Sequence, residues 1–166
     1  TSAAYQVGWC SWYHYFDGVT EDDISANLAR AGDWPFDVFQ LDDGYQPAIG
    51  DWLSTNAKFP SGIDGVASAV ATAGFTPGIW IAPFIVAPES EIARTHPEWM
   101  AREADDPDQP MIGMFNDIWG GFMYGLDITR PDVLEHLAAT ARDLVDAGYG
   151  YLKLDFTFSA KQRGRY

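Results

Sequence analysis

Short apolar segments alternate with amphipathic segments along the chain. Four of the apolar segments have the length and the flanking turn residues of buried strands, and three of the segments between them carry apolar residues at helical spacing. The expected strands span about residues 5–12, 36–41, 75–81 and 150–154, and the expected helices span residues 20–32, 64–73 and 131–147. Strands that alternate with helices predict an α/β fold with a parallel sheet and right-handed crossovers.

Local signals define the ends of these helices. Thr20 precedes the first helix, and Asp23 follows it at the spacing of a capping box. Gly32 is expected to stop this helix. Thr129 is expected to cap the last helix, with Pro131 in its first turn.

A long insertion, residues 83–126, separates the third strand from the last helix. It is expected to contain a short helix over residues 88–95 and a hairpin near Met111 and Phe122. A loop of this length inside an α/β domain usually carries function.

The polar residues favour a barrel over a doubly wound sheet. No glycine-rich phosphate-binding turn follows any expected strand, which removes the usual support for a nucleotide-binding fold. Polar and aromatic residues instead gather where the strands end, which is typical of the catalytic face of a (β/α)8 barrel. They are Trp12, Tyr13, His14, Asp42, Asp43, Trp80, Lys153 and Asp155.

Composition narrows the classes of partner and site. The net charge of −14 disfavours nucleic acid and anionic membrane surfaces as partners. Cys10 is the only cysteine, so the chain can form neither an internal disulfide nor a cysteine-based metal site. Together with the absence of a signal peptide or membrane-length apolar run, it favours a reducing, cytoplasmic location.

Lys153 and Asp155 lie two residues apart on the fourth expected strand, so both side chains should point to the same side of the sheet. A nearby ammonium favours an ionised carboxylate, as a carboxylate nucleophile requires. A structural ion pair at a strand end is the alternative interpretation of the same spacing.

Asp42 and Asp43 directly follow the second expected strand. An Asp-Asp-Gly sequence is also typical of an ordinary turn, but two carboxylates at a barrel mouth could accept hydrogen bonds from two sugar hydroxyls. With Asp155 and His14 they could instead bind a divalent cation, yet no metal-binding spacing is present and Lys153 would compete. We therefore expect neither a metal nor a cofactor.

Six sequence strings, taken in order, resemble glycoside hydrolase family 36, a melibiase-like family in the same clan as family 27. They start at Gly8 (GWCSW), Leu41 (LDDG), Gly78 (GIWIAP), His96 (HPEW), Leu126 (LDITRP) and Tyr151 (YLKLD). The resemblance implies that residues 1–166 form the first half of a (β/α)8 catalytic domain. It also implies a retaining α-galactosidase without a cofactor, acting on an α-galactoside oligosaccharide or glycoconjugate.

The resemblance assigns roles to particular residues. Asp155 would be the nucleophile, Lys153 with Asp42 and Asp43 would bind galactose hydroxyls, and Trp12 and Trp80 would line the sugar pocket. The acid/base residue of the family follows the sixth strand and has no counterpart in this sequence. Two strings depart from the common family pattern, Ala82-Pro-Phe-Ile-Val and Leu154-Asp-Phe, so the preferred sugar stays open.

Other functions fit the same sequence. The parent protein could be an α-N-acetylgalactosaminidase, or a relative that transfers galactose as raffinose synthases do. The chain could alternatively be a non-catalytic half-barrel that binds sugar or pairs with a second copy, since four strands leave two open edges. Its expected protein partners are thus the remainder of the parent barrel or another copy in a homo-oligomer. An unrelated doubly wound domain with a phosphorelay or cofactor role is the least favoured reading.

Overall fold

The computed structural model describes residues 5–161, which form two compact units. The first unit contains a four-stranded sheet and is built from residues 5–45, 54–81 and 143–153. The second unit contains a three-stranded sheet and is built from residues 46–53, 82–142 and 154–161. Among these residues, no helix has both the length and the apolar character needed to cross a bilayer.

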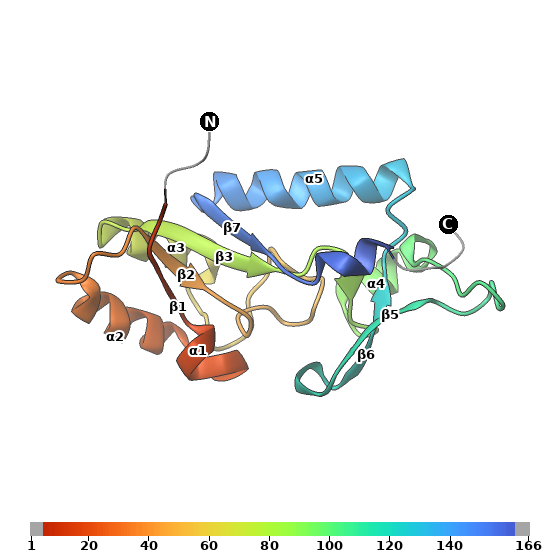
Figure 1. Ribbon diagram of the computed structural model, residues 1–166, viewed down its shortest axis with the longest axis horizontal. Coiled ribbons are helices and arrows are strands. Elements are labelled where there is room, and N and C mark those ends of the chain that lie inside the picture. Colours follow the sequence, from red (N-terminus) through yellow and green to blue (C-terminus); the bar gives the residue numbers. More distant parts are fainter. Residues whose placement is uncertain (1–4, 162–166) are drawn as a thin grey trace. The chain divides into compact units, whose positions relative to one another are not determined.

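The sheet of the first unit confirms the expected α/β fold (Figure 1). Its strands are parallel, with the order β1-β2-β3-β7. In the register, Cys10 pairs with Gln40, and Gln40 pairs with Gly78. The strands are β1 (Gly8–Cys10), β2 (Val38–Leu41), β3 (Thr76–Ile81) and β7 (Tyr151–Leu154).

The first strand is shorter than residues 5–12. Tyr5 is 91% exposed, so its ring packs against nothing that would hold a longer strand. Beyond Cys10 the backbone turns into the short helix α1 (Trp12–Tyr15), followed by the 3-10 turn η1 (Phe16–Gly18). Trp9 stays on the strand and stacks on Phe39, with 4.0 Å between ring centroids.

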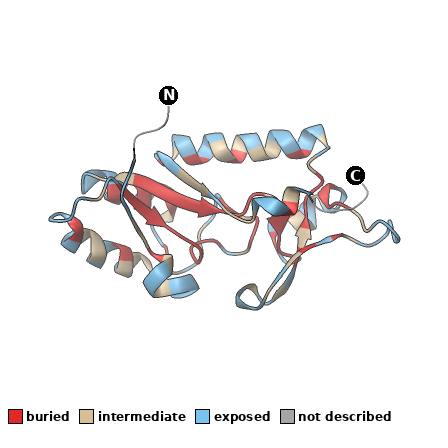
Figure 2. Cartoon of the chain, in the orientation of Figure 1, coloured by how far each residue is buried: buried red, intermediate tan, exposed pale blue. Residues whose placement is uncertain are grey.

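Helices α2 (Glu21–Ala31) and α3 (Gly62–Thr72) connect the first three strands and contact each other. The predicted capping box is present at α2: the Thr20 hydroxyl accepts from the Asp23 N–H, and the Asp23 carboxylate accepts from the Thr20 N–H. Figure 2 shows that β2 and β3 are buried. This core includes Phe39, Leu41, Val66, Val70 and Ile79.

The last helix, α5 (Pro131–Asp146), begins where the sequence predicted, but Thr129 is not its N-cap. Because Pro131 is the first helical residue, the cap position belongs to Arg130. Thr129 lies one residue further out, where its N–H and its hydroxyl both donate to Asp127, at 3.0 and 2.6 Å. The capping prediction was therefore wrong by one residue, and Asp127 organises the turn instead.

The insertion forms most of the second unit. The predicted hairpin is confirmed: β5 (Ile112–Asn116) and β6 (Gly121–Gly125) pair antiparallel around the 3-10 turn η3 (Asp117–Trp119). A short strand, β4 (Ile85–Val86), adds to β6. The predicted helix is the shorter α4 (Glu91–Thr95), because the Ser90 hydroxyl caps it by accepting from the Ala93 N–H. The turns η2 (Pro97–Trp99) and η4 (Thr157–Lys161) complete the elements.

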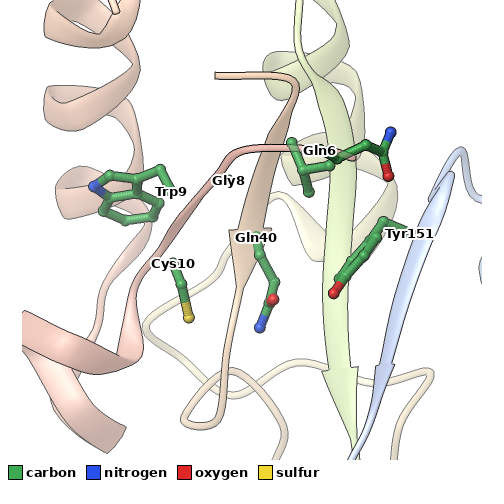
Figure 3. Close-up of a pocket in the computed structure, with 7 residues that line it drawn as sticks. Gln6, Gly8, Trp9, Cys10, Gln40 and Tyr151 are labelled. Atoms are coloured by element: carbon green, nitrogen blue, oxygen red, sulfur yellow. The ribbon is translucent and has the colours of Figure 1, made fainter. Parts of the chain in front are cut away.

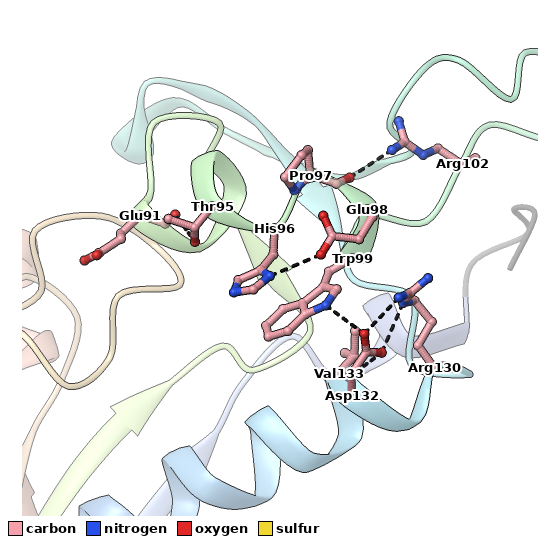
Figure 4. Close-up of polar contacts among 10 residues, drawn as sticks. All are labelled: Glu91, Thr95, His96, Pro97, Glu98, Trp99, Arg102, Arg130, Asp132 and Val133. Carbon is pink, nitrogen blue, oxygen red and sulfur yellow. Dashed lines mark hydrogen bonds and ion pairs between the residues drawn. The ribbon is translucent and has the colours of Figure 1, made fainter.

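Trp99 joins α4 and η2 to the start of α5 (Figure 4). His96 stacks on its ring at 3.9 Å, and its indole N–H donates to Asp132 at 3.1 Å. Arg130 donates twice to the same carboxylate, at 3.1 and 2.8 Å, and this pairing lowers the pKa of Asp132 to about 2. His136 contacts the indole from α5, with 5.1 Å between centroids. Both histidines are thus packing partners of Trp99.

Acid is expected to destabilise the protein through His136. Burial, and then the neighbouring His96, lower the pKa of His136 from 6.5. As pH falls, this histidine is therefore protonated in the unfolded chain before it is protonated in the folded protein. The contribution of His136 to the free energy of unfolding is fully present above pH 6.5, and it is lost as pH drops below 6.5. His136→Gln should reduce the loss of Tm between about pH 7.5 and 5.5. An unchanged loss would show that His136 does not contribute to acid sensitivity.

Candidate active site

The carboxyl ends of the parallel strands carry most of the residues singled out in the sequence. Asp42 and Asp43 follow β2, Trp80 lies near the end of β3, and Lys153 lies on β7. Asp155 is the first residue after β7. These positions correspond to the end of a parallel sheet where α/β enzymes place their catalytic groups.

Asp42 makes several polar contacts within the first unit. Its side chain is 2% exposed, and its Oδ2 accepts from the Lys153 ammonium at 2.9 Å. The same oxygen accepts from the Gln40 amide at 2.5 Å and from the Cys10 thiol at 3.3 Å. Its Oδ1 accepts from the Asp43 N–H at 3.0 Å. Asp42 therefore links β1, β2 and β7 through one carboxylate.

The ion pair with Lys153 offsets the cost of burying the charged Asp42 carboxylate. Removing a carboxylate from water costs several kcal/mol unless a counter-charge and hydrogen bonds replace the lost solvation. Lys153 supplies the charge, while its side chain stays 30% exposed. Four donors contact Asp42, three of them at Oδ2 and one at Oδ1, so hydrogen bonds also replace part of the lost solvation.

The structure adds a second carboxylate to the surroundings expected for Lys153. The sequence predicts that Lys153 lies beside the carboxylate two residues further along the chain. The ion pair observed for Lys153 is with Asp42, which is far away in the sequence. The pair with Asp42 could not be predicted from the strand period, because it depends on the fold that brings the two residues together.

Asp155 is half-buried, and its Oδ1 accepts from the N–H of Phe156 at 2.8 Å. Phe156 has a φ of +49°, a left-handed conformation that costs an L residue about 1–2 kcal/mol. The candidate nucleophile is thus followed at once by a strained residue. Such strain persists only where surrounding structure holds it, and it is common at functional sites.

The remaining predicted residues differ in accessibility. Asp43 is 2% exposed and Trp80 is 1% exposed. The Tyr45 hydroxyl donates to the Trp80 carbonyl at 3.2 Å, and burial raises the pKa of this phenol. Trp12 lies on α1 rather than on a strand; it is partly exposed and packs edge-to-face on Phe16. Of the two tryptophans, Trp12 therefore presents the more accessible ring.

Sequence reasoning missed three residues that contact Asp42. Ser11 accepts from the Asp42 N–H at 2.9 Å, and Gln40 and Cys10 donate to its carboxylate. Gln40 carried a signal, since it is a polar residue within an apolar strand and lies two positions before Asp42. Burial, followed by the charge of Asp42, raises the pKa of Cys10 to about 11. Cys10 therefore acts as a protonated donor rather than as a nucleophile.

A cavity of about 190 Å³ adjoins these donors in the first unit (Figure 3). A Cβ atom on Gly78 would meet Gln40 and Tyr151 at 3.2 Å, so glycine leaves room for both.

Within residues 5–161, no group of three His, Cys, Asp or Glu side chains could hold a metal ion. The residues that line the cavity of the first unit are Gln6, Gly8, Trp9, Cys10, Val38, Gln40 and Tyr151.

Known proteins resemble this chain over most of its length. α-Galactosidase AgaA of Geobacillus stearothermophilus is 33% identical over 150 residues, which cover 85% of this chain and 19% of that protein. An Escherichia coli α-galactosidase is 26% identical over 134 residues, covering 76% of this chain and 18% of that protein.

Solved structures give the same result. The Thermus thermophilus α-galactosidase TtGalA superposes with a TM-score of 0.90 and 36% identity, covering 98% of this chain and 33% of that one. The family 36 enzyme AgaA superposes with a TM-score of 0.77 and 26% identity over 90% of this chain and 21% of that one. The chain thus spans a third or less of these relatives. Since the Melibiase family profile also matches residues 7–164, the chain belongs to the melibiase family of glycoside hydrolases.

Proposed function

We propose that this chain contributes the nucleophile and part of the sugar-binding site to a retaining α-galactosidase. The observation that carries the proposal is the buried Asp42–Lys153 ion pair at the carboxyl end of the sheet, in a member of this family. Asp155 follows Lys153 by two residues. The Thermus relative has been solved in complexes with an aryl α-galactoside and with stachyose, which supports α-galactosides as the substrate class.

In this mechanism, Asp155 attacks the anomeric carbon from the side opposite the leaving group. A carboxylic acid from outside residues 1–166 protonates the departing oxygen, and a β-linked galactosyl ester of Asp155 forms. Water then attacks the ester while the same outer carboxylate takes its proton. Two inversions return galactose with its original α configuration, and Asp155 is regenerated.

The neighbouring residues bind the sugar and keep it in place. Lys153 has three ammonium protons, so it can donate to a galactose hydroxyl as well as to Asp42. A hydroxyl that donates to Asp42 must displace or share the place of one of its four donors, and a hydroxyl that donates to Asp43 must reach a side chain that is 2% exposed. Of the two candidate tryptophans, Trp12 is accessible enough to pack on a sugar face, whereas Trp80 is buried and would have to become exposed first.

The stereochemical outcome tests the reaction class. In the full-length enzyme, hydrolysis of p-nitrophenyl α-galactopyranoside should release α-galactose first, as followed by proton NMR before mutarotation. The β anomer as first product would contradict a covalent Asp155 intermediate. Faster turnover of the corresponding α-N-acetylgalactosaminide would transfer the assignment to that substrate without changing the mechanism.

A further inference from the structure

The backbone next to Asp155 is unusual for its residue type. Phe156 is one of two non-glycine residues in the described part of the chain with positive φ, and it follows Asp155 directly. Its N–H donates to Asp155 Oδ1 at 2.8 Å. The peptide unit that carries this N–H joins the two residues, so a change in the backbone of Phe156 would also move the hydrogen bond to the carboxylate.

The ring of Phe156 makes two aromatic contacts. The ring of Trp119 meets the ring of Phe156 edge-to-face, with 5.3 Å between centroids and 83° between planes. The ring of Phe158 also meets the Phe156 ring edge-to-face, with 6.1 Å between centroids and 78° between planes. A left-handed bulky residue needs such contacts, because the extended and right-handed regions are otherwise more stable.

The position of Trp119 is itself fixed by the hairpin of the insertion. Trp119 ends η3, the turn that joins β5 to β6. Asn116 Oδ1 accepts from the Ile118 N–H at 3.0 Å, which closes the first part of the turn. Gly120, with φ of +80°, closes the second part by donating to the Asp117 carbonyl at 3.2 Å. The backbone that carries the Trp119 indole is therefore held by the hydrogen bonds of this turn.

We propose that Trp119 is a positioning residue for Asp155. Its ring keeps Phe156 in the left-handed conformation, and the Phe156 N–H in turn keeps the Asp155 carboxylate in the orientation needed for attack. The inference rests on the proposed function, because it assigns a role to Trp119 only if Asp155 is the nucleophile. It also gives the long insertion a part in catalysis that neither its sequence pattern nor the family comparison assigns.

Kinetics of Trp119 variants in the full-length enzyme test the proposal. Trp119→Ala should lower kcat by about 30-fold while KM changes by less than about 3-fold, since a misplaced nucleophile slows chemistry without weakening binding. Trp119→Phe should restore kcat to within about 3-fold, because a phenyl ring can still contact Phe156. The matched control is Phe115→Ala, which removes an exposed ring of the same hairpin and should leave both constants within about 2-fold.

A second background separates positioning from direct contact with substrate. Phe156→Gly removes the ring and tolerates positive φ without strain, so Trp119→Ala should cause less than about 3-fold further loss of kcat in it. An equal loss of kcat in both backgrounds, or a loss expressed mainly in KM, would overturn the proposal.

The assays are read at a temperature where circular dichroism shows every variant folded. If Trp119→Ala keeps full kcat while Asp155→Gly is inactive, this inference fails and the proposed function stands. If Asp155→Gly keeps its turnover, the proposed function itself fails.

Discussion

Replacing Asp155 with glycine in the full-length enzyme is expected to lower kcat for p-nitrophenyl α-galactoside by at least about ten-thousand-fold. The substitution removes the group that forms the covalent intermediate, so the two-step mechanism can no longer operate. Added azide or formate should restore part of the turnover, because a small anion can occupy the space left by the carboxylate.

The matched control is Asp105→Gly. Asp105 is an exposed residue in a loop of the insertion, and its replacement should leave kcat within about 2-fold. Turnover in Asp155→Gly that equals that of the control would contradict the assignment of the nucleophile. Inactivity without any rescue, in a variant that remains folded, would leave a purely structural role for Asp155 and would count against the proposal as well.

Replacing Lys153 with methionine is expected to reduce both stability and turnover. Methionine fills a similar volume but removes the charge that balances Asp42, which is 2% exposed. We expect a loss of about 2 kcal/mol in the free energy of unfolding, below the roughly 3–5 kcal/mol for fully buried pairs because Lys153 is partly exposed. kcat/KM should fall by about a hundred-fold, since a charged donor to the sugar is lost as well.

A double-mutant cycle isolates the pair. Asp42→Asn combined with Lys153→Met should be less destabilising than the sum of the single changes, by about 1–2 kcal/mol in urea denaturation. Lys161→Met, which changes an exposed lysine, is the control and should be within about 0.5 kcal/mol of the parent. Simple additivity of the Asp42 and Lys153 variants would show that the ion pair contributes nothing.

Much of the fold followed from local sequence patterns. The capping box at Thr20, the apolar run over 38–41 and the hairpin of the insertion depend on residues close together in the chain, and each is present. The first strand was predicted too long because its aromatic residues look like strand residues, whereas Tyr5 is exposed and Trp12 is helical. Pattern alone does not reveal whether an aromatic ring finds a packing partner.

The candidate site was predictable in its residue types and less so in its contacts. The strand period predicts that Lys153 and Asp155 share one side of the sheet, whereas the pairing of Lys153 with Asp42 depends on β2 and β7 belonging to one sheet. Cys10 gave no signal, because a thiol that donates to a carboxylate is indistinguishable in sequence from a small apolar residue. The left-handed conformation of Phe156 was equally hidden, since the ring that contacts Phe156 belongs to Trp119, on a hairpin distant in sequence.

The configuration of the product that Asp155→Gly forms with azide tests the central claim most directly. If Asp155 is the nucleophile, azide enters from the face of the sugar that the carboxylate occupied, and the product from an α-galactoside is β-galactosyl azide. NMR distinguishes this product from its anomer. Formation of α-galactosyl azide would mean that another carboxylate is the nucleophile and that Asp155 acts as the acid/base, which would contradict the account.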